Sequence, residues 1–473
     1  MIKRILSATL VLCLVAALAL AAGCTEGGSG NAGSKSTGSK SGTGTGSVTV
    51  DDVYGAGLSE DEITALQNSG TITLYTDKSN LVKGEPNEDQ KDEYDFYKKY
   101  YGLTIKWKYQ AWGDNLTKFM VDYANNDAPD FIELNYRRWP KAGTRKVVFS
   151  LDELRENGVV GLDHPQITRY NDIASRFCIG KTLYSAGVNY VDPSVCAYNV
   201  ELFDQYKVKS PGEYYAEGTW DLDAYVKCAK ELTRTLSDGT KIWGGFWRDH
   251  TYYLVADDAR LVDWNEDGTK LVLNISKTSI IKALEVWMYT YLNGYSPKPS
   301  EGGSDAFGKG QMGMFICDVN NYASKAVDYT FKWDIVPTPL GSHNVSGQIP
   351  GECSGNGVVD SSKNPQGVIN YCIAVSLYRE ARYNQKYGVY YLPRFSQGVY
   401  NEKQLEMILP MGDHIGRDLY MGVSDLYSIQ YRAFWDPLKD GKMSVKETID
   451  AYENEWQEMV NEENQAMEEA RKK

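Results

Sequence analysis

Three short apolar runs decide the fold of this chain: TITLYT at residues 71–76, LTIKWKY at 103–109 and FIEL at 131–134. Apolar and polar residues alternate in the first two runs, which is the pattern of a strand with one buried face. The segments between the runs, 86–101 and 116–123, have the apolar spacing of helices. The order strand, helix, strand, helix, strand predicts a parallel sheet with its ligand crevice at the carboxyl ends of its strands.

The later part of the chain is richer in helical patterns. Thr219 is placed to cap a helix, and Pro365 takes the first position of another. Ser444 and Glu447 form a capping box ahead of a last helix. The sequence therefore predicts an α/β protein.

The first 23 residues have the pattern of a signal peptide and do not contribute to the fold. Lys3 and Arg4 precede the uncharged stretch Ile5–Ala22, and small residues lead into Cys24. This junction resembles a bacterial lipobox, in which the cysteine is lipidated and becomes the first mature residue, although Ala21 stands where Leu is usual. The alternative is an uncleaved membrane anchor, because the uncharged stretch approaches a spanning length. Both interpretations place the rest of the chain outside the cytoplasm.

Residues 24–48 are predicted to be the lipidated cysteine and a flexible tether. Thr25–Ser47 consists mostly of Gly, Ser, Thr, Lys and Asn, so it cannot bury apolar surface. A coil of this length has an end-to-end distance of about 25 Å. The globular part is therefore expected to work beside a membrane and to be held there only by the lipid.

The formal net charge of −13 excludes some classes of partner. Nucleic acid and anionic lipid surfaces both require clustered Lys and Arg, and this chain has more acidic than basic residues. We expect a soluble, monomeric body that repels its neighbours.

Six cysteines remain after Cys13 in the signal and Cys24 at the anchor. None of them is spaced as CxxC and the chain has only four His, so neither a zinc site nor another cofactor is predicted. The six could form three disulfides, but a domain of this size needs none. Buried free thiols are the preferred interpretation.

Several segments together resemble the family 1 extracellular solute-binding proteins of ABC importers, the group that includes maltose-binding protein. The segments follow the order of the family's motifs: Asn125–Asp130 (NNDAPD), Tyr198–Phe203 (YNVELF), Thr219–Thr233, Phe307–Met312 (FGKGQM), Trp333–Pro339 (WDIVPTP) and Gly355–Pro365 (GNGVVDSSKNP). Each motif is weak by itself. Their order over roughly residues 70–380 makes the resemblance specific.

The resemblance implies a two-lobed periplasmic-binding-protein-like fold of type II, with the solute held between hinge-linked lobes. We expect lobe 1 to contain residues 49–197 with 301–338, and lobe 2 to contain 198–300 with 339–473. The chain would cross between lobes near Cys196–Val200, near Val336–Leu340 and near Pro297. The implied function is capture of an oligosaccharide for the transmembrane subunits of an ABC permease.

Sugars present apolar faces to aromatic rings and hydroxyls to polar side chains. Such side chains follow the predicted strands, in a chain with 11 Trp and 35 Tyr. The predicted ligand-binding residues are Asp77, Trp112, Asp114, Glu133, Asn135, Tyr136, Trp139, Trp247, Asp249, Asp318, Asn320 and Trp435. Trp112, Trp139 and Trp247 would stack on the sugar, although packing in the core is an equal alternative for each.

Two other functions stay open at this point. A lipid-anchored glycoside hydrolase would use two carboxylates about 5 to 10 Å apart. The same fold could instead bind a polyamine or another cation in an acidic, aromatic crevice. The sequence has no GxSxG nucleophile motif and no complete phosphate loop, so we expect a binding protein without enzyme activity.

Overall fold

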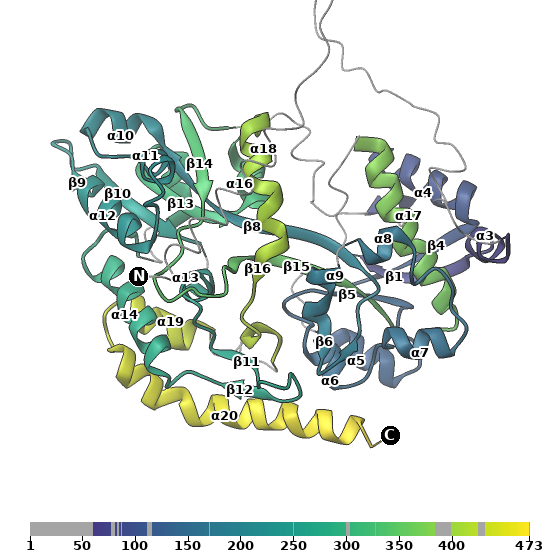
Figure 1. Ribbon diagram of the computed structural model, residues 1–473. Coiled ribbons are helices and arrows are strands. Elements are labelled where there is room, and N and C mark those ends of the chain that lie inside the picture. Colours follow the sequence, from purple (N-terminus) through teal and green to yellow (C-terminus); the bar gives the residue numbers. More distant parts are fainter. Residues whose placement is uncertain are drawn as a thin grey trace, which may run out of the picture. The chain divides into compact units, whose positions relative to one another are not determined.

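Figure 1 shows a computed structural model of the chain. It describes residues 60–76, 81–82, 85–86, 88–110, 116–169, 171–248, 250–298, 303–326, 328–383, 399–423 and 431–472. All of them belong to one compact unit, Ser47–Lys473. The signal, the tether and Cys24 lie outside the described residues. Among the helices of the described ranges, none is long and apolar enough to span a bilayer.

The first lobe is a parallel sheet with helices on both faces (Figure 1). Its strands are β1 (Gly70–Thr76), β4 (Leu103–Tyr109) and β5 (Phe131–Leu134), and its main helices are α3 (Glu60–Gln67), α4 (Glu88–Tyr101), α5 (Thr117–Ala124) and α17 (Pro365–Tyr383). Both β4 and β5 pair with β1 in parallel, which confirms the predicted sheet. Ile72 and Leu74 of β1 lie in one core cluster with α4 and α17, while Phe119 of α5 lies in another with Ile132.

The second lobe contains the rest of the large sheet. Its strands are β9 (Arg234–Thr235), β10 (Lys241–Trp247), β13 (Met312–Asp318) and β14 (Trp333–Pro337), and its helices include α10 (Val200–Tyr206), α11 (Pro211–Ala216), α12 (Leu222–Leu232), α13 (His250–Ala256), α14 (Thr278–Leu292), α15 (Gly303–Gly308) and α16 (Val319–Ala326). Asp221, and not the predicted Thr219, caps α12, because its carboxylate accepts the Ala224 N–H. Gly244 lets β10 approach α12, since a Cβ there would lie 1.9 Å from the Ala229 carbonyl oxygen.

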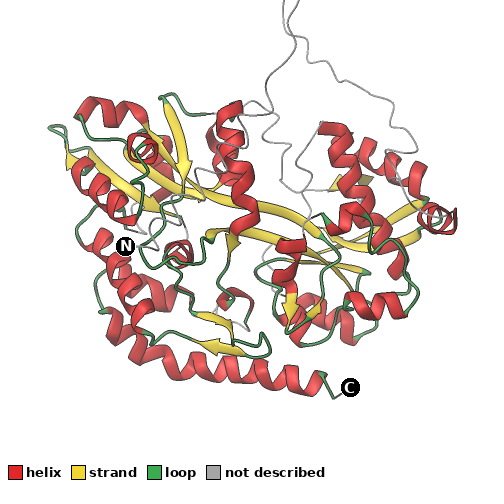
Figure 2. Cartoon of the chain, viewed as in Figure 1, coloured by secondary structure: helices red, strands yellow, loops and turns green. Residues whose placement is uncertain are grey.

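Two long strands join the lobes, and Figure 2 shows them in yellow across the centre. They are β8 (Val188–Asn199) and β15 (Ile349–Val358), which pair with each other antiparallel. At one end β15 pairs with β5, and at the other β8 pairs with β13 and β14. The register of β15 against β8 shifts between Ser354 and Gly355, so the pairing passes from Tyr190 to Val188 and skips Asn189. A bulge of this kind bends a strand and redirects side chains.

The predicted lobe boundaries need correction. Residues 301–338 were expected in lobe 1, but β13 and β14 pair with β8 and β10 in the second lobe. The chain does not cross at Val336–Leu340, because the Leu340 carbonyl accepts the Leu222 N–H of the same lobe. It crosses at β15 instead. The first crossing lies along β8, a few residues before the predicted Cys196–Val200.

Two further boundary predictions also differ from the structure. Near Pro297 the chain stays in the second lobe, since the Ser296 hydroxyl donates to the Gly245 carbonyl at 2.8 Å. The helix α17 was assigned to lobe 2, but it packs on α4 and β1 of the first lobe. The described chain resumes at Val399 in the second lobe, where the Tyr400 hydroxyl donates to the Val319 carbonyl at 2.8 Å.

The carboxyl-terminal part adds helices to the second lobe. Its elements are α18 (Glu402–Ile408), η5 (Leu409–His414), β16 (Ile415–Gly416), η6 (Tyr420–Gly422), α19 (Tyr431–Lys439) and α20 (Val445–Ala470). The predicted capping box of Ser444 and Glu447 begins α20. This helix packs on α14 and α19 with its first half and on α6 (Lys141–Thr144) of the first lobe with its second half (Figure 1).

The remaining elements are short. They are β2 (Leu81–Val82), β3 (Glu85–Pro86), α7 (Leu151–Glu156), α8 (Pro165–Thr168), α9 (Asn171–Ala174), η2 (Ser175–Phe177), β6 (Cys178–Ile179), β7 (Thr182–Leu183), β11 (Val262–Trp264) and β12 (Leu271–Leu273). The strands β11 and β12 form an antiparallel hairpin whose turn is residues 265–270.

Candidate functional site

Polar side chains gather where strand β5 of the first lobe ends. Glu133 accepts hydrogen bonds from the side-chain amide of Asn135 at 3.5 Å and from that of Asn189 at 3.3 Å. Asn189 is the residue at the bulge of β8, so the bulge turns its side chain toward the first lobe. The structure therefore brings predicted residues Glu133 and Asn135 together with a connecting strand.

Tyr136 follows directly, and its ring is flanked by cations. Arg137 donates from Nε to the Tyr136 hydroxyl at 3.0 Å. The guanidinium carbons of Arg137 and Arg417 lie 5.2 and 5.5 Å from the ring centroid. Arg417 also donates to the Cys353 carbonyl of β15 at 3.1 Å. Tyr136, like Glu133 and Asn135, therefore lies beside the connecting strands.

Asp318 forms the matching group in the second lobe, at the carboxyl end of β13. Arg248 donates from Nη1 to its Oδ2 at 2.7 Å, and the Tyr252 hydroxyl donates to its Oδ1. With its amide oxygen turned toward Arg248, Asn321 accepts from Nε at 3.0 Å. Asp318 is buried and the Arg248 side chain is 44% exposed. The buried carboxylate therefore fixes a guanidinium that still reaches solvent.

Asp192 of β8 links this second group to the connecting strands. Its Oδ1 accepts the backbone N–H of Asn320 at 2.9 Å, at the beginning of α16. Asp192 lies opposite Glu352 of β15 in the ladder. Burial and the nearby carboxylates of Glu133 and Glu352 raise the pKa of Tyr190 well above its usual value, so this hydroxyl stays protonated. The connecting strands thus place polar groups next to both lobes.

Some buried polar atoms near these strand ends have no hydrogen-bond partner among the described residues, and two of them are on amide side chains. One is Nε2 of Gln110, which follows β4 directly, and the other is Oδ1 of Asn320, which follows β13. The Gln110 amide oxygen is already engaged, because Arg138 donates to it at 3.1 Å. An unpaired buried polar group costs about 1–3 kcal/mol. One lobe therefore offers an open donor and the other an open acceptor, both at strand ends.

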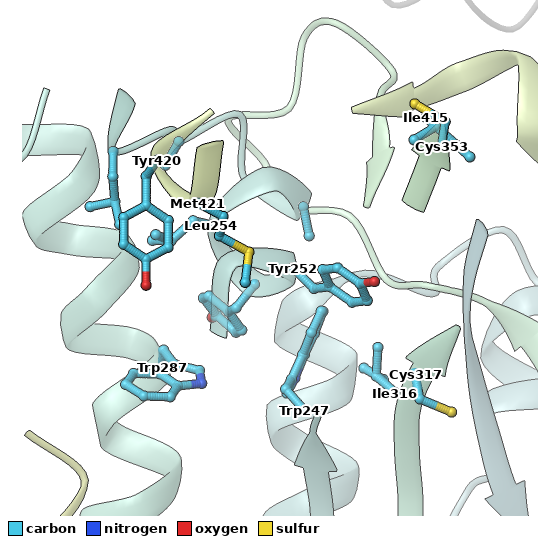
Figure 3. Close-up of a cluster of buried hydrophobic side chains, with 14 of the residues drawn as sticks. Trp247, Tyr252, Leu254, Trp287, Ile316, Cys317, Cys353, Ile415, Tyr420 and Met421 are labelled. Carbon is cyan, nitrogen blue, oxygen red and sulfur yellow. The ribbon is translucent and has the colours of Figure 1, made fainter. Parts of the chain in front are cut away.

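The tryptophan predictions are corrected by burial. Trp139 is 2% exposed and packs edge to face on Phe177. Trp247 is also 2% exposed and packs on Tyr225 and Tyr253. Figure 3 shows its ring inside a cluster of buried side chains, beside Tyr252. These rings fill the core, so they offer no free face to a sugar in this structure.

Trp435 is also buried in the core, since it is 0% exposed and lies edge to face with Trp287. Four other predicted ligand-binding residues remain: Asp77, Trp112, Asp114 and Asp249. These four residues lie outside the described ranges and stay predictions.

The described cysteines form no disulfides and are mostly buried. All six of the described cysteines are free thiols, five of them buried and Cys178 partly buried. Burial raises the pKa of the Cys317 and Cys353 thiols, which keeps them protonated and unreactive. Within the described ranges, His, Cys, Asp and Glu side chains do not gather in threes as metal ligands would.

Sequence reasoning missed several residues of the polar groups. Asp192 stands within an apolar strand, and a lone acid in such a strand was the available signal. Arg248 and Asn321 are neighbours of predicted residues, and Gln110 is the first residue after β4. Counting one position beyond each strand end would have included Arg248 and Gln110, whereas Asn321 lies three residues after the end of β13.

Two α/β lobes joined by strands, with polar groups at facing strand ends, define a ligand-binding protein of the periplasmic-binding-protein class. The family of bacterial extracellular solute-binding proteins matches the chain over residues 82–370, which is more than half of its length. The chain belongs to this family, as the sequence motifs indicated. Its place of action is therefore extracytoplasmic.

Solved structures of similar proteins support the same fold. An ABC substrate-binding protein from Listeria monocytogenes, in complex with cycloalternan, is 18% identical with a TM-score of 0.60, over 84% of this chain and 99% of that one. The sugar-binding protein MalE from Xanthomonas citri is 14% identical with a TM-score of 0.59, over 85% and 98%. The GacH receptor of Streptomyces glaucescens, solved unliganded and with acarbose, is 16% identical with a TM-score of 0.55, over 83% and 99%. A comparison with curated proteins found no match.

Proposed function

We propose that this protein captures an oligosaccharide between its lobes and delivers it to the transmembrane subunits of an ABC importer. The observation that carries the proposal is the pair of unmatched buried atoms, the donor of Gln110 and the acceptor of Asn320. A hydroxyl both donates and accepts hydrogen bonds, so a chain of sugar hydroxyls satisfies both atoms. The exposed guanidinium of Arg248 supplies further donors. Solved relatives with cycloalternan and acarbose agree with this class of solute.

The carboxylates of the second lobe argue against a polyamine as the solute. A polyamine needs carboxylate oxygens that are open to its ammonium groups. Both oxygens of Asp318 are already engaged, by Arg248 and by Tyr252. The oxygen of Asp192 that faces Asn320 accepts a backbone N–H. These acids position donors for a neutral solute.

We also propose that the protein binds its solute without chemical turnover and is held at the membrane by lipid on Cys24. The engaged carboxylate of Asp318 is a poor general acid or base, because its charge is balanced by Arg248. A hydrolase would instead need one carboxyl group with a raised pKa beside an open carboxylate.

Calorimetry with oligosaccharides of several linkages, and with spermidine in parallel, tests the proposal. We expect at least one oligosaccharide to bind and to be recovered unchanged by mass spectrometry after prolonged incubation. The Asn320→Ala and Gln110→Ala variants should each bind it about 2- to 13-fold more weakly, because each loses one hydrogen bond of about 0.5–1.5 kcal/mol.

The matched control is Asn461→Ala, at an exposed position of α20, which should bind the sugar like the unchanged protein. Binding of spermidine with no binding of any oligosaccharide would reject the sugar assignment. Release of shorter sugars during the incubation would show that the protein is a hydrolase.

A further inference from the structure

A pocket of about 520 Å³ lies apart from the polar groups of the two lobes. We call it the seam pocket, because it lies between the first lobe and the end of α20. The first lobe supplies Met120, Tyr123 and Phe149, and α20 supplies Ala466 and Glu469. Its size suits a small organic molecule better than a single ion.

One corner of the seam pocket is acidic. Asp360 lines it, and the Tyr123 hydroxyl donates to the Asp360 Oδ2 at 2.8 Å. The other oxygen, Oδ1, is buried and has no hydrogen-bond partner in the described part of the chain. Burial raises the pKa of Asp360, which measures how poorly its charge is solvated there. The Tyr123 hydroxyl and the backbone N–H of Ser361 oppose this rise only in part, and a cationic donor would stabilise the carboxylate further.

The seam pocket also contains basic side chains with N–H donors that are not all used. Arg145 lines it and donates from Nη2 to Glu463 at 3.1 Å, but its buried Nε has no partner among the described residues. Lys146 also lines the pocket and forms an ion pair with Glu153, with Nζ 3.6 Å from its Oε1. An ammonium group has three N–H donors, so this ion pair does not use all of them. These two cations retain donors for an anionic ligand group.

We propose that the seam pocket is a second binding site, which takes a free α-amino acid with an apolar side chain. Its ammonium group pairs with Asp360, and its carboxylate pairs with Arg145 and Lys146. The side chain lies against Met120 and Phe149. A simple amine would pair with Asp360 but leave Arg145 without a partner, and a simple carboxylic acid would do the reverse. A zwitterion pairs with both side chains at once. The site is independent of the sugar proposal and shares no residue with it.

The probe for this site is L-leucine, compared with two molecules that each lack one of its charged groups. 3-Methylbutylamine lacks the carboxylate, and 4-methylpentanoate lacks the ammonium group. Calorimetry on the full chain without sugar should show leucine binding. Each half-ligand should bind about tenfold more weakly or worse, because a hydrogen bond to a charged group contributes about 1.5–3 kcal/mol.

Two variants locate the site and one serves as a control. Asp360→Asn removes the charge without changing the size, and Ala466→Phe fills the pocket from α20. Both should weaken leucine binding by about tenfold or more. Asp163→Asn makes the same chemical change at a side chain that is 87% exposed, and it should leave binding unchanged.

Melting temperatures without ligand show whether each variant is folded. If Ala466→Phe does not fold, the binding measurement on Asp360→Asn tests the site. The proposal is overturned if leucine does not bind, or if it binds Asp360→Asn as tightly as the unchanged protein. It is also overturned if 3-methylbutylamine binds as well as leucine, since the site would then recognise an amine alone.

Discussion

At the scale of single residues, side chains that follow strands fall into two groups. Glu133, Asn135 and Asp318 lie in hydrogen-bonded groups at the strand ends. Trp139 and Trp247 stand at similar places in the sequence but turn into the core. The buried tryptophans therefore contribute to stability.

The buried tryptophans lead to a stability prediction. Trp139→Ala and Trp247→Ala should each lower the free energy of unfolding by about 3–5 kcal/mol, because each removes a large ring from a packed core. Urea denaturation of the unliganded protein measures this loss. Tyr215→Ala, at a ring that is 47% exposed, should change stability by no more than about 0.5 kcal/mol. A tryptophan variant with unchanged stability and weakened sugar binding would contradict the assignment to the core.

Glu133, Asn135 and Asp318 lie at strand ends as expected, whereas Trp139 and Trp247 are buried, and the reason is physical. A charged or amide side chain after a strand avoids the core, so its position implies exposure to the crevice. A tryptophan is stable on either side, and only the packing of distant residues such as Phe177 decides. Asp192 was missed because an acid within an apolar strand is unusual, and one partner that stabilises it, the Asn320 N–H, is far away in the sequence.

At the scale of elements, local patterns located strands and helices but not their partners. The strands at 71–76, 103–109 and 131–134 and the parallel sheet were predicted correctly, because alternation and spacing are local signals. The crossing was placed at Val336–Leu340 instead of β15, since pairing with β5 depends on residues more than 200 positions away. Ladder partners of this kind leave no trace in the pattern of one strand.

The helix α20 yields a prediction at this scale. Its Glu463 is 0% exposed, accepts from the Thr144 hydroxyl and pairs with Arg145 of the first lobe at 3.1 Å. Glu463→Gln keeps the shape but removes the charge, which should lower the free energy of unfolding by about 1–3 kcal/mol. Arg145 is one-third exposed, so water offsets part of the loss.

Chemical denaturation measures this effect, and Glu458→Gln is the matched control. Glu458 is exposed on the same helix, so its replacement should be nearly neutral. Equal effects of the two variants would mean that the contact between α20 and the first lobe contributes nothing to stability.

At the scale of the whole molecule, the prediction concerns attachment to the membrane. Cys24→Ala removes the thiol at the lipobox-like junction, and the described part of the chain has no helix that could replace it as an anchor. We expect this variant to fold and bind sugar normally while taking up no labelled fatty acid and leaving the membrane fraction. Incorporation of the label into the variant would show that the lipid is attached elsewhere or that the anchor is a different one.

The two crossing strands have a mechanical consequence. β8 and β15 are paired along their crossing, so the connection between the lobes is a two-stranded ribbon. Such a ribbon bends along its length, whereas a hinge turns at a few residues. Paired strands twist and bend together, and a rotation of the lobes is therefore shared among many peptide units. The shifted register after Ser354 interrupts the ladder and is the point of least stiffness in the ribbon. We therefore expect the lobes to return to their resting arrangement when the solute leaves, without a further partner to drive them apart.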